Sequence, residues 1–324
     1  MTHVQDDAFA AAVARQLDEI EQELLAVAVA DSPYVTEAAR HIISAGGKRF
    51  RPLLVALCAN FGAAAELSRL VSAAIVVELT HAASLYHDDV MDEADLRRGV
   101  KSANARYGNT VAILVGDYLF ARASARVATL GVEYVRLQAD TFARLVQGQI
   151  AETLGPEPGA DPIEHYLSVV TDKTASLIST SCVFGGMIGG ASDEALAALA
   201  AYGEELGVVF QLSDDLIDVT SDATGKVAGT DLREGVATLP TLLLRDSSVE
   251  SDRALLDLID NGLQTEQDVR AALAQLRANP VIGRARAEIS RRAEIARSHL
   301  AVLPEGPAKA ALDQLCDQVV LRSA

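Results

Sequence analysis

The pentapeptide DDVMD at residues 88–92 returns as DDLID at residues 214–218, and each copy ends an apolar, Ala-rich stretch typical of a buried helix. Isolated carboxylates in such a helix would protonate or cost several kcal/mol, so each group of three needs cations nearby. On a helix, the first and last Asp of a copy lie one turn apart on one face, which suits Mg2+. One copy alone would more often cap a helix or lie at the surface. Two copies that both end apolar helices predict a helical protein that binds Mg2+ and a polyphosphate.

The composition favours closely packed helices. Half of the 324 residues are hydrophobic, only 4% are aromatic and Trp is absent, while Ala, Leu and Val dominate. No stretch shows the alternation of a half-buried strand, so we expect an all-α bundle. After the Gly- and Pro-rich loop at residues 155–159 the helical pattern resumes at once. We therefore expect one domain over residues 1–324, with a motif-bearing core at about 36–245 and C-terminal helices at 246–324.

The charge of the chain limits its partners. The formal net charge is -17 at pH 7, whereas nucleic acids and anionic membranes bind basic surfaces. We therefore expect neither as a standing partner, although local Arg, Lys and Mg2+ can still bind small anionic substrates.

Location and redox state are predicted from three further features. The first residues lack a basic segment followed by an apolar core, so we expect no signal peptide and a cytoplasmic location. The most apolar run, residues 70–86, contains Glu78 and His81 and is typical of a core helix rather than a membrane span. The three cysteines form no CxxC pair and are odd in number, which predicts buried free thiols.

Apolar residues at helical spacing predict helices over residues 9–29, 36–44, 53–61, 65–91, 109–127, 134–153, 163–188 and 193–217. From residue 242 to the end we expect amphipathic helices, with breaks near residues 247, 261, 279–280 and 304. Both acidic motifs therefore lie at helix C-termini, where carboxylates oppose the helix dipole and need compensation.

Two basic segments could supply that compensation or bind phosphate. KRFRP at residues 48–52 follows Gly46-Gly47 and precedes an apolar helix, so its side chains and the helix N-terminus both favour an anion. Taken alone, the same segment could be a solvated basic loop. Arg97-Arg98-Gly99 follows the first acidic motif and either balances its charge or clamps the phosphate that Mg2+ also binds.

Several segments together resemble the trans-isoprenyl (polyprenyl) diphosphate synthases. In the order and spacing of that family, they are GGKRFRP at 46–52, ELTHAASLYHDDVMDEADLRRG at 78–99, GDYL at 116–119, KTASLI at 173–178, and FQLSDDLID followed by GK..G.DLREG..TLP at 210–240. The resemblance implies an isoprenoid synthase-type helical bundle around a central cavity, usually as a homodimer. It also implies a prenyltransferase that ionises an allylic diphosphate and adds isopentenyl diphosphate to the carbocation, giving a trans product one unit longer. The leaving diphosphate can accept the released proton, so no protein base is required.

By the same resemblance, the Asp residues of the two motifs serve Mg2+, with about three ions per active site when substrate is bound. Asp88 and Asp92 are the expected direct ligands, and Asp89 orients the site. Asp214 is expected to hold the third ion, while Asp215 and Asp218 act through water or neighbouring groups.

The resemblance also assigns the two substrates to two groups of residues. The allylic diphosphate is expected to contact Arg97, Lys173, Thr174, Gln211 and Lys226. Isopentenyl diphosphate is expected to contact Lys48, Arg51, His81 and Arg98. A lone His on an apolar helix is more often a bonded core residue, but this one lies two turns before the acidic motif on the same face. The residues expected to act in catalysis are Asp88, Asp92, Asp214, Lys173 and Arg97.

Product length is predicted from the helix that carries Asp88. One turn rises about 5.4 Å, close to one extended isoprene unit, so successive turns towards the N-terminus act as a ruler. The ruler positions Ala83, Ser84 and Thr80 are small, whereas in the family aromatic side chains near this point stop growth early. We therefore predict a product of about seven to ten isoprene units, as in quinone side chains. A bulky side chain from another helix, for example Phe142, could close the cavity and shorten the product.

Several alternatives remain open. The nearest is the same chemistry with a shorter product, geranylgeranyl or farnesyl diphosphate. Terpene cyclases and head-to-head condensing enzymes also use Asp-rich helices, but they lack the paired motifs together with GGKRxRP and RRG. A noncatalytic subunit of a heteromeric synthase would release no diphosphate, and the intact acidic motifs argue against it. Lys101 stands where the family commonly has Pro, which leaves the loop shape open, and transient membrane contact during product release is compatible with these features.

Overall fold

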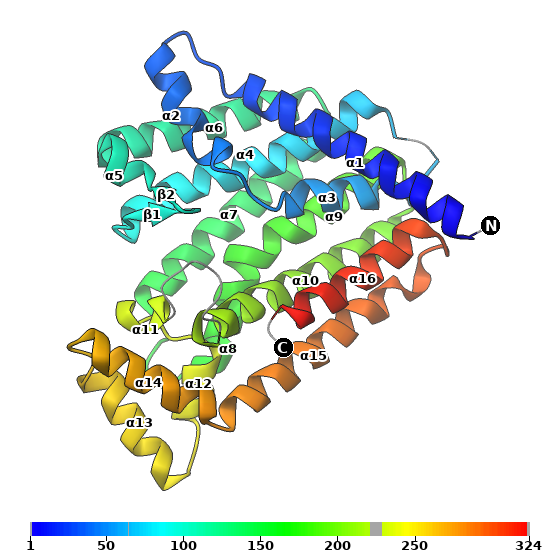
Figure 1. Cartoon of the computed structure of the whole chain (residues 1–324). Coiled ribbons are helices and arrows are strands. Elements are labelled where there is room, and N and C mark those ends of the chain that lie inside the picture. The colour runs from blue at the N-terminus through cyan, green and yellow to red at the C-terminus, as the bar shows by residue number, and fades with distance from the viewer. Residues whose placement is uncertain (1, 64, 221–228, 323–324) are drawn as a thin grey trace. The chain divides into compact units, whose positions relative to one another are not determined.

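The computed structural model describes residues 2–63, 65–220 and 229–322, and most of them are helical (Figure 1). In chain order the elements are α1 (Thr2–Val27), α2 (Pro33–Ser44), α3 (Phe50–Cys58), α4 (Leu67–Met91), β1 (Leu96–Arg97), β2 (Val100–Lys101), α5 (Ala103–Tyr107), α6 (Asn109–Ala128), α7 (Val132–Leu154), α8 (Pro162–Val170), η1 (Thr171–Ala175), α9 (Ser176–Gly189), α10 (Asp193–Thr220), α11 (Thr230–Glu234), α12 (Leu239–Arg245), α13 (Glu250–Asn261), α14 (Glu266–Ala278), α15 (Val281–His299), η2 (Leu300–Val302) and α16 (Pro307–Leu321). The all-α class predicted from the sequence is confirmed, and so are the predicted breaks after residue 242.

The starts of α2 and α8 follow ordinary capping chemistry. The Ser32 side chain accepts a hydrogen bond from the backbone of the first turn of α2, and Asp161 does the same for α8. In both helices Pro occupies the first position, where the missing N–H costs nothing. Because of Ser32 and Pro33, α2 begins at Pro33, whereas the sequence predicted a start at residue 36.

The chain divides into two compact units, each with several segments. The first unit contains Met1–Ala143, Leu177–Gly203 and Val302–Leu312, and the second contains Arg144–Ser176, Glu204–Ala301 and Asp313–Ala324. The first acidic motif belongs to the first unit and the second motif to the second unit. The single domain expected from the sequence stays a prediction.

The centre of the first unit is α4. It packs against α6, α3 and α1, and every residue from 70 to 80 is buried. A helix enclosed on all sides needs apolar residues all round, which explains why its sequence is not amphipathic. Nearby, α9 lies so close to α3 that a Cβ atom on Gly185 would be 2.4 Å from the Val55 carbonyl oxygen. The glycines of α9 therefore serve close helix packing.

A short antiparallel hairpin follows α4. Leu96 of β1 pairs with Lys101 of β2, and the turn residues Arg98 and Gly99 have φ of 52° and 78°. Positive φ at both central residues is the pattern of a type I′ hairpin turn. The sequence predicted no strand here because two-residue strands are too short to show alternation.

The second unit contains the π-helical turn η1, which separates α8 from α9. The sequence predicted one continuous helix over residues 163–188, because a π turn has no apolar periodicity of its own. Further along the chain, α12 packs against α15 and α8, and α13 packs against α14.

Two helices, α4 and α10, are long and apolar enough to cross a membrane by length and composition alone. In α4, 78% of the most apolar window is buried inside the protein, and in α10 the share is 56%. Core helices commonly have this composition, so the test is weak evidence for a membrane span. The cysteines Cys58, Cys182 and Cys316 are buried and free, as predicted.

Candidate active site

The first acidic motif forms the last turn of α4 and the residue that ends it. The backbone N–H of Asp92 donates to the Asp88 carbonyl oxygen at 2.8 Å, so the helical path continues through the motif. The two residues therefore lie one turn apart on the same side of the helix. Asp88 is half-buried and Asp92 is exposed. Two carboxylates placed in this way are hard oxygen donors that fit a divalent cation.

Asp89, between them, is fully buried. Nε of Arg97 in β1 donates to one of its carboxylate oxygens at 2.7 Å, and the backbone N–H of Ala103 donates to the other at 3.2 Å. A buried carboxylate requires such partners. Asp89 thus ties the hairpin and the start of α5 to the end of α4.

The Gly46-Gly47 turn packs against Arg98 of the hairpin. Nη1 of Arg98 donates to the carbonyl oxygen of Gly46 and, at 3.1 Å, to that of Ile42. A Cβ atom on Gly47 would lie 3.1 Å from the guanidinium carbon of Arg98, so a side chain there would crowd it. The two basic segments found in the sequence are therefore brought together in the first unit.

Arg49, which the sequence reasoning did not assign, ties this turn to two helices. It has φ of 47°, and its Nη1 donates at 2.9 Å to Glu78 of α4. Its Nη2 donates at 2.7 Å to Glu21 of α1. Glu78 is only 3% exposed, and a buried carboxylate in an apolar helix signals that a cation must reach it.

Positive charge gathers around His81. Burial lowers the pKa of its imidazole well below the ordinary value, and the guanidinium charges lower it further. The arginines that act on it are Arg51, Arg98, Arg97 and Arg49. His81 is therefore neutral at pH 7.

Arg51 is half-buried beside these arginines. Burial lowers its pKa to about 10, and the charge of Arg98 acts in the same direction while Glu78 opposes it. Its Nε is buried and has no hydrogen-bond partner among the described residues. Because buried donors are normally satisfied, an orphaned donor beside other cations indicates a site for an anionic ligand.

The second acidic motif lies near the end of α10. Asp215 is buried and accepts hydrogen bonds from the Tyr166 hydroxyl and, at 2.8 Å, from Nε2 of Gln211. Burial raises the pKa of Asp215 to about 6, against the opposing effect of these two hydrogen bonds. Tyr166 could not be found from the sequence, because its approach to Asp215 depends on tertiary packing.

The outer carboxylates of this motif have different partners. Asp214 accepts from Nη2 of Arg322 at 2.6 Å. Asp218 accepts from the backbone N–H groups of Thr230 and Asp231 at 3.3 and 3.2 Å, at the start of α11. Asp218 therefore fixes the chain where it enters α11.

The predicted diphosphate-binding residues Lys173 and Thr174 lie in the π turn η1. Nζ of Lys173 contacts the carboxylate of Glu152, and Oγ1 of Thr174 donates to Oε1 of Gln211 at 3.2 Å. Gln211 in turn reaches the second acidic motif through Asp215. The second unit thus brings these predicted residues together.

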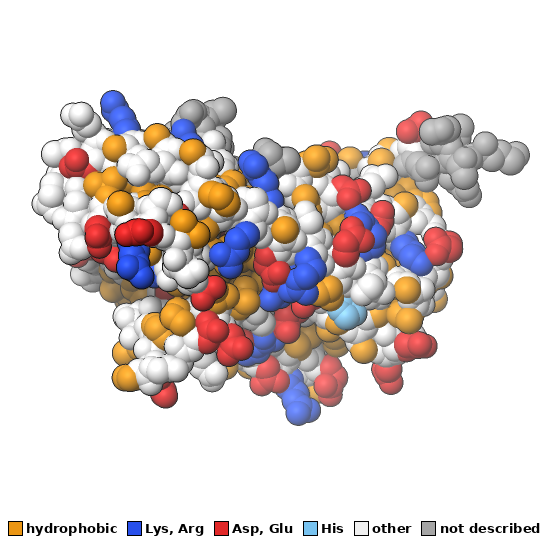
Figure 2. Space-filling model, turned by 90° about the horizontal axis from the view of Figure 1, so that it is seen from below, with side chains coloured by type: hydrophobic (Ala, Val, Ile, Leu, Met, Phe, Trp, Pro, Cys, Tyr) orange, Lys and Arg blue, Asp and Glu red, His pale blue; other side chains and the backbone are white. Residues whose placement is uncertain are grey.

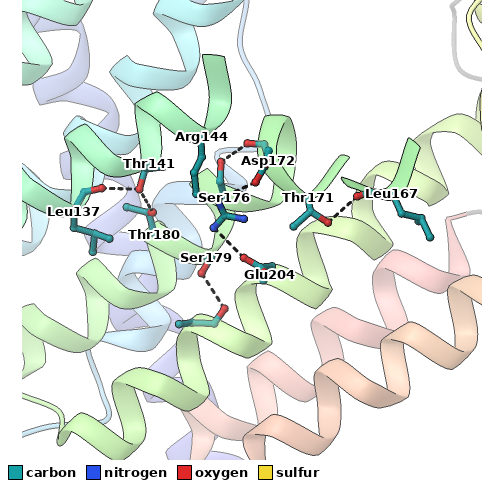
Figure 3. Close-up of polar contacts among 11 residues, drawn as sticks. Leu137, Thr141, Arg144, Leu167, Thr171, Asp172, Ser176, Ser179, Thr180 and Glu204 are labelled. Atoms are coloured by element: carbon teal, nitrogen blue, oxygen red, sulfur yellow. Dashed lines mark hydrogen bonds and ion pairs between the residues drawn. The ribbon is translucent and has the colours of Figure 1, made fainter. Parts of the chain in front are cut away.

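Arg144 of α7 holds the π turn from the side, as Figure 3 shows. Its Nε donates to Asp172 at 2.9 Å and its Nη1 donates to Glu204 of α10 at 3.0 Å. A Cβ atom on Gly148 would lie 2.6 Å from the backbone nitrogen of Lys173. Close contact with α7 therefore sets the position of the residue before Lys173 and of Lys173 itself.

The predicted ruler residues lie inside the first unit. Ala83, Ser84 and Thr80 are buried. Oγ1 of Thr80 donates to the Val76 carbonyl oxygen at 2.7 Å and accepts from Nε2 of Gln138 in α7 at 3.3 Å. The Phe142 ring lies 4.3 Å from the Phe120 ring, centroid to centroid.

The structure says little about two of the predicted substrate-binding residues. Lys48 is exposed on the loop before α3, and Lys226 lies outside the described residues. Within the described ranges, no group of three or more His, Cys, Asp or Glu side chains is arranged to hold a metal ion. The paired carboxylates of Asp88 and Asp92 are hard oxygen donors one turn apart, as a divalent cation prefers.

The profile of the polyprenyl synthetase family matches residues 32–276. A nonaprenyl diphosphate synthase of Mycobacterium tuberculosis is 46% identical over 320 residues, which cover 98% of this chain and 95% of that protein. A solved structure of a geranylgeranyl pyrophosphate synthase from Corynebacterium glutamicum, complexed with calcium and isoprenyl diphosphate, has a TM-score of 0.87 and 39% identity over 97% of both chains. A decaprenyl diphosphate synthase from Rhodobacter capsulatus has a TM-score of 0.88 and 34% identity, covering 98% of this chain and 99% of that one.

These similarities extend over nearly the whole chain and include both acidic motifs and both basic segments. The isoprenoid synthase-type fold expected from the motifs is confirmed by the solved structures. The chain belongs to the polyprenyl synthetase family and is a prenyltransferase.

Proposed function

We propose that the protein condenses isopentenyl diphosphate with an allylic diphosphate to give a long-chain all-trans-polyprenyl diphosphate. The observation that carries this proposal is the set of arginines around His81, with the buried Nε of Arg51 unpartnered among the described residues. Such a concentration of positive charge calls for an anion with several oxygens. The relatives named nonaprenyl and decaprenyl diphosphate synthase support the long product.

In this proposal the diphosphate of isopentenyl diphosphate is bound by Lys48, Arg51 and Arg98, with His81 beside it. The low pKa keeps His81 neutral, so it can donate one hydrogen bond to a phosphate oxygen without adding charge. Arg98 is already anchored to two carbonyl oxygens. Little reorganisation is needed when such fixed donors meet the substrate.

The allylic diphosphate is assigned to Arg97, Lys173, Thr174 and Gln211, and also to Lys226, which lies outside the described residues. Each described member is held by a neighbour: Arg97 by Asp89, Lys173 by Glu152, Thr174 by Gln211, and Gln211 by Asp215. Donors fixed before the reaction stabilise the charge that develops as diphosphate leaves. The leaving diphosphate accepts the proton lost from the new allylic chain.

Asp88, Asp92 and Asp214 are the carboxylates that we propose to bind divalent cations, with Mg2+ favoured by their hard oxygen donors. Mg2+, when bound, neutralises charge on the leaving diphosphate. The related structure with calcium and isoprenyl diphosphate supports the use of a divalent metal, and about three ions stays the expected number. As the family resemblance implies, we assign Asp89 to orienting the site, and Asp215 and Asp218 to acting through water or neighbouring groups.

For product length we propose that Ala83, Ser84 and Thr80 let the chain extend along α4. The polar contact between Thr80 and Gln138 lies about 12 Å from Asp88 along the helix, at 1.5 Å per residue. A product longer than about two isoprene units must pass this contact, which makes Gln138 a candidate for control of length beside Phe142. The shorter-chain alternative keeps its support from the geranylgeranyl pyrophosphate synthase at 39% identity.

We further propose a cytoplasmic homodimer in which residues 1–324 of each copy serve one activity. The family match over residues 32–276 includes parts of both units. Exposed apolar side chains on α6 and α7, including Ile113, Leu114 and Val132, are suited to cover by a second copy. On the face drawn in Figure 2, acidic and basic side chains are interspersed, as suits small anionic substrates better than nucleic acid.

Release of diphosphate from the two substrates in the presence of Mg2+ tests the activity. Asp88→Ala should lower kcat about a hundredfold or more, since a group acting on the leaving diphosphate is removed. Glu66→Gln changes an exposed acid at the other end of α4 and should keep the parent rate. Near-normal turnover in Asp88→Ala would remove Asp88 from the proposed metal ligands, and no turnover by the parent would favour the noncatalytic alternative.

A further inference from the structure

The carboxylate of Asp214 has a cationic partner from the last helix of the chain. Nη2 of Arg322, the residue that follows α16, donates to Asp214 Oδ1 at 2.6 Å. The same guanidinium lies over the ring of Phe210, with its carbon 5.0 Å from the ring centroid. Phe210 and Asp214 are four residues apart on α10, so they form one surface that receives Arg322.

Other contacts of the second unit hold Arg322 in this place. Arg297 of α15 donates to Asp313 and to Asp317 of α16, each at 2.6 Å. These ion pairs fix the later turns of α16 against α15, so Arg322 extends from an anchored helix. The sequence motifs end well before α16, and they give no indication of a site residue there.

A divalent cation bound to Asp214 and the guanidinium of Arg322 need the same carboxylate. Mg2+ binds carboxylate oxygens at about 2.0–2.1 Å and holds an octahedral shell of further ligands around itself. Arg322 donates to Oδ1 at 2.6 Å, so a cation on either oxygen of this carboxylate would lie close to the guanidinium, and the two positive charges would repel each other. Both cations cannot keep their full contact with Asp214.

We propose that Arg322 is a positioning residue of the second acidic motif, a built-in counter-ion that holds the Asp214 carboxylate and competes with the divalent cation for it. This inference rests on the proposed function, in which Asp214 is a metal ligand. Binding of the cation then displaces Arg322 and loosens the end of α16. Metal binding and the position of the C-terminal helix are thereby coupled.

Titration of the full-length protein with Mn2+ in the presence of inorganic diphosphate, with free Mn2+ followed by EPR, tests this competition. Arg322→Gln removes the charge and should tighten the weakest Mn2+ binding step about two- to fivefold, the range expected for an exposed ion pair. Arg322→Lys keeps the charge and should stay near the parent. Arg297→Gln loosens α16, so it should tighten the same step by less than Arg322→Gln does. Arg291→Gln changes an exposed arginine of α15 that pairs with Glu288 of the same helix, and it should leave Mn2+ affinity unchanged.

Hydrogen exchange of residues 316–322 gives a second readout that does not depend on turnover. In the parent, this segment should exchange faster once Mn2+ and diphosphate are added, because Arg322 has been displaced. In Arg322→Gln it should exchange fast without them. Unchanged or weaker Mn2+ binding by Arg322→Gln, or slower exchange of the parent segment on metal addition, would overturn the inference.

Asp214→Asn separates this inference from the function on which it rests. If this variant binds Mn2+ as the parent does, Asp214 is no metal ligand, and the proposed role and the competition are both wrong. If it binds Mn2+ more weakly while Arg322→Gln matches the parent, Asp214 keeps its role and only the competition is wrong.

Discussion

Burial gives single side chains of this protein a chemistry that their residue type alone does not predict. His81 stays neutral because burial and the neighbouring arginines lower its pKa. Arg51 is held with a buried Nε that the described residues do not satisfy. The crowded positive charge around His81 and the unsatisfied Nε of Arg51 both lower the stability of the ligand-free protein. A bound anion would relieve both, so these two residues are expected to contact the proposed diphosphate substrate.

The pH dependence of stability should reveal His81. In the unfolded chain its imidazole binds a proton below a pH of about 6.5, whereas the folded chain resists protonation. Above that pH, His81 takes nothing from the free energy of unfolding. As the pH falls towards the lowered pKa of the folded state, the unfolded chain binds a proton that the folded chain does not, and the free energy of unfolding decreases. When the pH falls from 7.5 to 5.5, His81 should lower the free energy of unfolding by about 1 kcal/mol. The His81→Gln variant should lack this decrease.

Urea unfolding at the two pH values measures this difference. His165→Gln, which changes a histidine of α8, serves as the control and should keep the pH dependence of the parent. If His81→Gln loses as much stability on acidification as the parent, the imidazole is not held neutral by the fold.

At the scale of elements, short irregular pieces place the functional groups that long helices cannot. The hairpin β1–β2 brings Arg97 to Asp89 and Arg98 to the Gly46-Gly47 turn. The π turn η1 carries Lys173 and Thr174, and π turns inside helices are frequent at functional sites. Arg144 fixes this turn through Asp172, so the geometry of η1 depends on a side chain that does no chemistry itself.

Loss of the Arg144 contacts should therefore affect one substrate more than the other. Arg144→Gln should raise KM for the allylic diphosphate about tenfold, because a small displacement of Lys173 weakens its contact with the leaving group. KM for isopentenyl diphosphate should change little, and stability should fall by less than about 1 kcal/mol, as for other exposed ion pairs.

Steady-state kinetics with each substrate varied in turn measures this split. Arg144→Lys should recover part of the loss, and Arg136→Gln, an exposed arginine on the same helix, should behave as the parent. Equal increases in both KM values would mean that Arg144 only stabilises the fold.

The sequence predicted those features that depend on local pattern. The acidic motifs, the basic segments and most helix ranges could be read because spacing along a helix fixes which side chains share a face. It could not predict η1, whose residues differ from an ordinary helix only in hydrogen bonding. It also missed Arg49, Tyr166 and Arg322, because each meets its carboxylate partner only through tertiary packing.

Product length is a property of the whole molecule, and we predict that this chain makes a long product. Its relatives include synthases named for nonaprenyl, decaprenyl and geranylgeranyl products, so family membership alone does not decide the length. The small residues Ala83, Ser84 and Thr80, all buried beneath Asp88 on α4, carry the prediction of length. If chain growth follows α4, a bulky side chain at one of these positions must shorten the product.

The product length can be measured by mass analysis after the purified full-length protein has reacted with farnesyl diphosphate and isopentenyl diphosphate in the presence of Mg2+. The parent should give products of about seven to ten isoprene units, and Ala83→Phe should give mainly shorter ones. A parent product of mainly geranylgeranyl diphosphate, or a product length that Ala83→Phe leaves unchanged, would contradict the account.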